Sequence, residues 1–184
     1  MEVLCAGLFL WAAYRLLTLF GVKRSALLWL PVIAAVVYTS ISFQQGDSAE
    51  ELCLPMIAWS LFGLMSWLRT RAPQRMETRG LLLHGVLCGC VLWIKFTMLG
   101  FYAAMILGMT LYHLVRREAK AAFLSLGWFA AGVALATLPW IVYFGVNGAV
   151  GPWLKTYLYD NLFLYQDGDA TTLAMRAKAM LRAA

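Results

Sequence analysis

Charged side chains are scarce in this 184-residue sequence, where aspartate, glutamate, lysine and arginine together make up 13%. Soluble domains carry roughly 25%, so a water-exposed fold of this size would lack the polar surface it needs. Hydrophobic residues instead reach 62%. Several apolar runs have the roughly 17–25 residues that cross a hydrocarbon core as helix, and they lack the alternating period of a transmembrane barrel. The sequence predicts an all-α, polytopic transmembrane helical bundle.

Several motifs of soluble enzymes are also missing. There is no P-loop, no GxGxxG and no GxSxG, so neither ATP-driven transport nor serine hydrolysis finds support. No HExxH or CxxC spacing occurs, and we expect no metal ion and no cofactor. The basic residues are scattered rather than gathered in one patch, which argues against a nucleic-acid partner. The four cysteines fall in or beside apolar runs and are interpreted as small packing residues: Cys5, Cys53, Cys88 and Cys90.

Six apolar segments predict about six spans. They lie at residues 3–20, 26–43, 53–68, 81–96, 101–115 and 122–146. Residues 81–115 would make roughly 52 Å of continuous helix, which is too long for one crossing. We therefore expect the helix to break between Lys95 and Gly100.

The chain changes character after the sixth span. Gly151 and Pro152 suit a helix start, and aromatic residues then recur at helical spacing, which predicts a helix lying at the membrane interface. Residues 167–169 are interpreted as a turn, and residues 171–184 as the start of a further helix. The sequence thus predicts a transmembrane bundle over residues 1–146 and an interfacial segment over residues 147–184.

The connections between the spans carry opposite charges. Lysine and arginine occur in the connections at residues 21–25, 69–80 and 116–120, whereas the loop at 44–52 has neither and contains Asp47, Glu50 and Glu51. Basic connections favour the cytoplasmic side of a cell membrane. We expect the three basic connections to be cytoplasmic, and the loop at 44–52 and the segment at 147–170 to lie outside.

The acidic loop leads directly into the third span. Gly46 permits a tight turn, after which Glu50 and Glu51 fall in the first turn of the helix, where the helix dipole favours negative charge. One interpretation is therefore a solvated helix start. The other is a carboxylate held at the membrane surface as a general base or as a ligand for a polar substrate. Asp47 belongs to the same loop, and the residues alone leave both interpretations open.

Lys95 is the second candidate because a charged group within a span is costly and usually faces a cavity or a partner. Its side chain can extend to the interface, or it can bind an anionic ligand such as a lipid phosphate. Its predicted depth and side of the membrane match those of Glu50 and Glu51. This coincidence favours a functional role.

These residues resemble a known family. Residues 46–55, Gly-Asp-Ser-Ala-Glu-Glu-Leu-Cys-Leu-Pro, are similar to the G-N-x-x-E-E-x-x-L-P loop of bacterial multi-pass glycosyltransferases related to protein O-mannosyltransferases and the lipid A aminoarabinose transferase. A lysine, Lys95, follows a span that contains Gly85 and Gly89, and an aromatic stretch with an asparagine follows the sixth span at residues 157–165. The resemblance covers roughly residues 16–165.

The resemblance implies a GT-C architecture, a helical bundle that transfers a sugar from a polyprenyl-phosphate carrier to an acceptor at the outer face of the membrane. It implies that Glu50 and Glu51 line the catalytic cavity and that Lys95 meets the phosphate of the carrier. Asp47, Tyr157 and Asn161 are the further substrate-binding residues that it suggests. The expected partners are the polyprenyl-phosphate-linked sugar donor and the lipid bilayer.

One departure from the family pattern concerns the first outer loop, where the family has its main catalytic aspartate. No matching loop precedes the first span here, so we expect a fragment that lacks this loop, and whether this chain alone is an active enzyme stays open. Two alternatives also stay open. One is a transporter or flippase, although the inverted repeat that would favour it is not found. The other is a non-catalytic membrane subunit.

Overall fold

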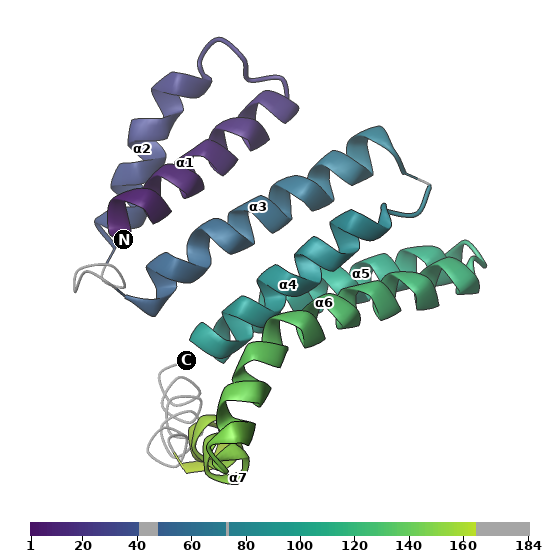
Figure 1. Ribbon diagram of the computed structural model, residues 1–184. Coiled ribbons are helices and arrows are strands. Elements are labelled where there is room, and N and C mark those ends of the chain that lie inside the picture. Colours follow the sequence, from purple (N-terminus) through teal and green to yellow (C-terminus); the bar gives the residue numbers. More distant parts are fainter. Residues whose placement is uncertain (41–47, 73, 165–184) are drawn as a thin grey trace, which may run out of the picture. The chain divides into compact units, whose positions relative to one another are not determined.

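The computed structural model describes residues 1–40, 48–72 and 74–164, and these residues form helices without a strand (Figure 1). The predicted all-α class is confirmed. A 3₁₀ helix, η2 (Phe96–Leu99), and a π-helix, η3 (Lys155–Leu164), accompany the α-helices. The α-helices of the described residues are α1 (Glu2–Leu19), α2 (Ala26–Tyr38), α3 (Ala49–Thr70), α4 (Thr78–Ile94), α5 (Gly100–Val115), α6 (Ala119–Val146) and α7 (Val150–Leu154).

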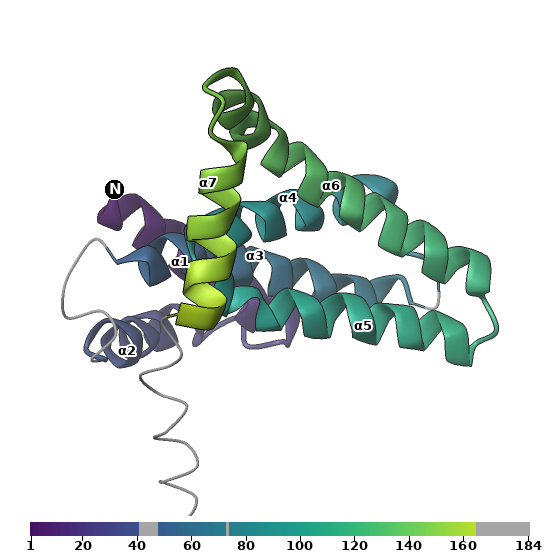
Figure 2. The ribbon, with the colours of Figure 1, turned by 90° about the horizontal axis from the view of Figure 1, so that it is seen from below.

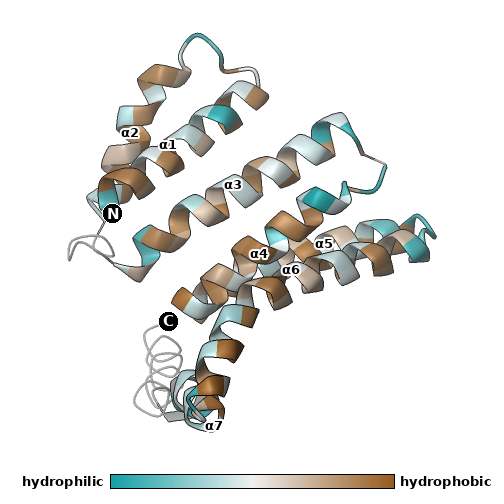
Figure 3. Cartoon of the chain, viewed as in Figure 1, coloured by the Kyte–Doolittle hydropathy of each residue, from teal (hydrophilic) through white to brown (hydrophobic). Residues whose placement is uncertain are grey.

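Four stretches of helix are long and apolar enough to cross a membrane: α1, α3, α6 and Phe96–Val115, which joins η2 to α5. Helices α2 and α4 are apolar but shorter, with 13 and 17 residues. Each predicted span thus coincides with one apolar helix, although the predicted end of the second span, Phe43, lies outside the described residues. Hydrophilic residues gather at the connections (Figure 3). The chain is a multi-pass membrane protein.

The predicted break between Lys95 and Gly100 is confirmed. Helix α4 ends at Ile94, and Lys95 has an extended backbone with φ −155° and ψ 92°. The short η2 helix then leads into α5, which begins at Gly100. Because an extended residue cannot continue an α-helix, the chain turns here, and Lys95 lies at the end of one helix rather than in the middle of a long one.

The described chain divides into two compact units, residues 1–137 and residues 138–164. In the first unit α3 lies between α1 and α4, and α2 packs on α1 (Figure 1). The indole Nε1 of Trp59 donates a hydrogen bond of 3.1 Å to the Leu8 carbonyl and so links α3 to α1. On the other side of α3, the buried Ser60 hydroxyl donates to the Tyr102 hydroxyl of α5 at 3.1 Å. Helices α5 and α6 then run antiparallel from a short turn (Figure 2).

Helices α4 and α6 approach closely through glycines. A Cβ atom on Gly85 would lie 2.1 Å from the Phe129 carbonyl oxygen, and one on Gly132 would lie 2.2 Å from the Leu82 carbonyl oxygen. Small residues let helix backbones meet in this way inside membranes. The Trp93 indole adds a 2.9 Å hydrogen bond to the Thr137 hydroxyl. This contact supports α4, the helix that carries Lys95 at its end.

The second unit contains the end of α6, which includes Pro139, followed by α7 and η3. The rings of Phe144 and Trp153 stack at 4.7 Å with an interplanar angle of 12°. Helix α7 begins at Val150, within one residue of the predicted start at Gly151. The predicted turn at 167–169 and helix at 171–184 lie outside the described residues. The predicted boundary between a bundle at 1–146 and an interfacial segment at 147–184 stays a prediction.

Candidate functional site

The start of α3 is fixed by a local capping motif. Ser48 precedes the helix with an extended backbone, and its hydroxyl accepts a 3.3 Å hydrogen bond from the Glu51 backbone N–H. Ser-x-x-Glu is the sequence of a capping box, in which the serine satisfies an N–H group that the helix leaves unpaired. The cap places Glu50 and Glu51 in the first turn of α3, as the sequence predicts. Sequence reasoning missed Ser48 itself, although the spacing was there to find it.

Glu50 and Lys95 form an ion pair between two helices. The Lys95 ammonium, at the end of α4, contacts the Glu50 carboxylate in the first turn of α3. Both side chains are partly buried, with 35% of Lys95 and 26% of Glu50 exposed. The predicted coincidence of depth is therefore a direct contact between residues 45 positions apart. We call the group formed by Glu50, Glu51 and Lys95 the acidic end of α3 and α4.

Glu51 differs sharply from its neighbour. Only 6% of it is exposed, and its Oε2 atom is buried without a hydrogen-bond partner among the described residues. A buried carboxylate oxygen without a partner costs free energy, because water is lost and nothing replaces it. Such a group is a candidate for contact with a substrate.

The other predicted site residues belong to other parts of the chain. Asp47 lies outside the described residues. Tyr157 and Asn161 belong to η3 in the second unit. All three stay predicted substrate-binding residues. The acidic end thus consists of two carboxylates and one ammonium, all carried by α3 and α4.

The described residues contain no group of three or more histidine, cysteine, aspartate or glutamate side chains that could hold a metal ion. The four cysteines are free thiols, and Cys53 and Cys88 belong to the hydrophobic core, which confirms their interpretation as packing residues. The side chains of the acidic end offer two carboxylates and one ammonium. A carboxylate can accept a proton, and an ammonium can bind an anion.

The comparison with protein families settles the class of the chain. Residues 4–154 match the dolichyl-phosphate-mannose-protein mannosyltransferase family, and this range covers the six apolar helices, except for the first two residues of α1, and the whole acidic end. The chain belongs to this family. It is a membrane glycosyltransferase domain of the GT-C class, and the family uses a dolichyl-phosphate-mannose donor. No curated protein and no solved structure matches the chain. The resemblance noted from the acidic loop and Lys95 is confirmed.

Proposed function

We propose that the acidic end of α3 and α4 transfers a sugar from a polyprenyl-phosphate carrier to an acceptor at the outer face of the membrane. The observation that carries the proposal is the pairing of Lys95 with Glu50 beside a buried, incompletely paired Glu51. One cation and one unsatisfied carboxylate are the two groups that such a transfer needs. The family match supplies the donor class, polyprenyl-phosphate mannose.

Lys95 can stabilise the leaving group, which is the phosphate of the carrier. As the bond between the sugar and the phosphate breaks, negative charge grows on the phosphate, and a preorganised ammonium stabilises it. In the described structure Glu50 holds that ammonium. A carrier phosphate therefore has to replace Glu50 as the partner of Lys95. Glu50 acts on this account as a positioning residue that holds the Lys95 side chain in place until the donor arrives.

Glu51 can act as the general base for the acceptor hydroxyl. A general base must reach the acceptor hydroxyl and take its proton while the sugar is transferred. The unpaired Oε2 of Glu51 has the lone pairs for this task, and its burial keeps competing water away. Two adjacent carboxylates thus have different roles because one has a cationic partner and the other does not.

The charge pattern supports the orientation. The connections at residues 21–25, 69–80 and 116–120 carry the lysines and arginines that mark a cytoplasmic side. The loop at 44–52 then lies outside, together with the acidic end and the segment at 147–170. Donor and acceptor accordingly meet at the outer surface of the cell membrane.

The test is mannose transfer from polyprenyl-phosphate mannose by the full-length protein in membranes. Lys95→Met should lower transfer by about 100-fold or more, the size expected when a transition-state charge loses its partner. Lys120→Met is the matched control, since Lys120 is an exposed lysine in a basic connection. It should stay within about twofold of wild type. Transfer by Lys95→Met at the level of Lys120→Met, with both proteins inserted normally, would refute the site.

A further inference from the structure

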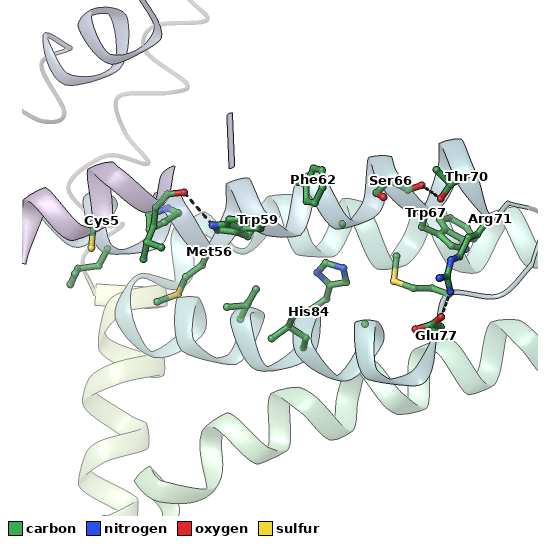
Figure 4. A pocket seen from close by; sticks show the side chains of 18 of the residues that line it. Cys5, Met56, Trp59, Phe62, Ser66, Trp67, Thr70, Arg71, Glu77 and His84 are labelled. Atoms are coloured by element: carbon green, nitrogen blue, oxygen red, sulfur yellow. Dashed lines mark hydrogen bonds and ion pairs between the residues drawn. The ribbon is translucent and has the colours of Figure 1, made fainter. Parts of the chain in front are cut away.

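A long apolar groove runs between α1, α3 and α4 in the first unit, with a volume of about 820 Å³. Its walls include Met56 and Trp59 on the side of His84 toward Cys5, and Trp67, Met76 and Leu83 on the side toward Arg71. Figure 4 shows α3 and α4 facing each other across the groove, with the imidazole of His84 reaching toward α3. The groove lies within segments that cross the membrane, where empty space forfeits dispersion contacts. A hydrocarbon chain is the occupant that such walls fit.

The groove is narrowed near its middle. A Cβ atom on Gly63 would lie 2.6 Å from the Cε1 atom of His84, so the imidazole rests directly on the α3 backbone. From Gly63 to Arg71 there is roughly 12 Å of helix. One leaflet of a bilayer contributes about 15 Å of hydrocarbon. The half of the groove beyond His84 therefore has the depth of a single leaflet.

The charged end of that half is cationic. Arg71 lines the groove and pairs with Glu77, and Figure 4 shows the pair at the end of the groove far from Cys5. In the same connection, Arg75 donates to the Thr78 hydroxyl through Nη2, while its Nη1 is buried without a partner among the described residues. An arginine nitrogen shielded from water and without an acceptor is a cost that an anion would offset. We call Arg71, Arg75 and Glu77 the basic mouth.

From this geometry we propose that the groove binds an anionic glycerophospholipid from the leaflet next to the basic mouth. One acyl chain lies between α3 and α4 up to His84, and the phosphate contacts Arg71 and Arg75. The polyprenyl-phosphate sugar carrier fits this groove less well. Lys95, the cation assigned to its phosphate, does not line the groove and stands at the opposite end of α4. Among the described residues that line it, the lysine or arginine side chain is that of Arg71.

The test is lipid retention by the full-length protein in detergent, measured by native mass spectrometry with phosphatidylglycerol or phosphatidylcholine as the probe. Wild type should retain phosphatidylglycerol about tenfold better than phosphatidylcholine. Arg71→Gln or Arg75→Gln should remove most of this preference. Glu77→Gln should strengthen it, because it frees Arg71 for the phosphate. Arg79→Gln is the matched control, since Arg79 is an exposed residue in the first turn of α4, whereas Arg71 lines the groove and Arg75 has a buried Nη1 without a partner.

A second pair of variants tests the acyl chain. Ser66→Trp places a large ring inside the groove and should lower retention of both lipids, whereas Leu107→Trp, on an exposed position of α5, should not. Three results would each overturn the proposal. In the first, wild type retains the two lipids equally. In the second, Arg79→Gln lowers the preference for phosphatidylglycerol as much as Arg71→Gln does. In the third, the protein retains polyprenyl phosphate, and this retention depends on Lys95 instead of Arg71. The arginine variants decide the question even if Ser66→Trp fails to fold.

Discussion

The two ends of α3 and α4 both carry ion pairs, but they use them differently. At the basic end, Arg71 pairs with Glu77 across a short connection, and the two side chains are 56% and 64% exposed. At the acidic end, Glu50 pairs with Lys95 across 45 positions of sequence, and both are only about a third exposed or less. The first pair closes a turn. The second joins two helices.

The difference helps to distinguish charged residues that mark the side of the membrane from charged residues that could contact a substrate. Several polar groups at the basic connections have partners close by in the sequence: His113 Nδ1 lies 2.9 Å from Glu118 Oε2, and Trp67 Nε1 donates to the Gln74 carbonyl at 2.7 Å. Such local pairs stabilise a connection and mark its side of the membrane. At the acidic end one carboxylate oxygen of Glu51 is buried without a hydrogen-bond partner among the described residues, as Arg75 Nη1 is at the basic mouth. An unsatisfied group that a fold retains is the better sign of a site.

The largest expected effect comes from removing the scaffold that both ends share. Gly85→Leu forces a side chain against the Phe129 carbonyl, so α4 and α6 cannot approach. We expect loss of the folded protein, seen as absence of a monodisperse peak in detergent chromatography. Gly127→Leu is the control, because a Cβ atom there meets nothing within 4 Å. Normal folding of Gly85→Leu would show that the close α4–α6 contact is dispensable.

The next effect separates the carboxylates of the two ends. Glu51→Gln should reduce mannose transfer by about 100-fold or more, the range expected for loss of a general base. Glu77→Gln changes a carboxylate at the basic end and should leave transfer within about twofold of wild type. The measurement is transfer in membranes at matched protein levels. Equal losses of mannose transfer in the two variants would contradict the assignment of catalysis to the acidic end alone.

A smaller effect compares the two ion pairs themselves. A double-mutant cycle with Glu50→Gln and Lys95→Met should give a coupling of about 1 kcal/mol in unfolding free energy, as polar pairs within membranes do. The cycle with Arg71→Gln and Glu77→Gln should give about 0.5 kcal/mol or less, because both partners are largely exposed. Reversible unfolding in mixed micelles provides the measurement. A larger coupling for the exposed pair would contradict the assigned burial.

The smallest effect is a pH dependence of the stability, and it arises at Glu118 in the connection between α5 and α6. The hydrogen bond with His113 holds the pKa of Glu118 below its usual value, and Arg116 adds to this shift. A depressed folded-state pKa means that the stabilisation is present above the unfolded pKa and is lost as the pH falls through the folded value. Wild type should therefore be slightly more heat-stable than Glu118→Gln above about pH 5.5. The difference should shrink in acid, and a difference that grows in acid would reverse the sign.

Much of the fold could be predicted because its signals are local. The lengths of the apolar runs and the charges between them placed the six apolar helices, and the length limit of a single crossing located the break after Lys95. The first turn of α3 was predicted with both of its glutamates. The shared depth of Lys95 and the acidic loop also followed from counting residues along the spans.

The pairing at the site could not be predicted, since it depends on helix rotation. Consecutive residues on a helix point about 100° apart, so Glu50 or Glu51 alike could have faced Lys95 until packing decided. The groove depends in the same way on how far α1 lies from α4, which the sequence does not state. Two signals were present but unused: the Ser48 capping spacing, and the glycines that bring α4 against α6.

The most direct test of the central claim is the affinity of the protein for a polyprenyl phosphate in nanodiscs, which reports on the acidic end independently of catalysis. Lys95→Met should weaken binding by about tenfold or more, as loss of a charged hydrogen bond does. Lys120→Met should bind as wild type does, and Glu50→Gln should bind more tightly because Lys95 is freed. Unchanged affinity in Lys95→Met would contradict the account, since the carrier phosphate would then bind elsewhere.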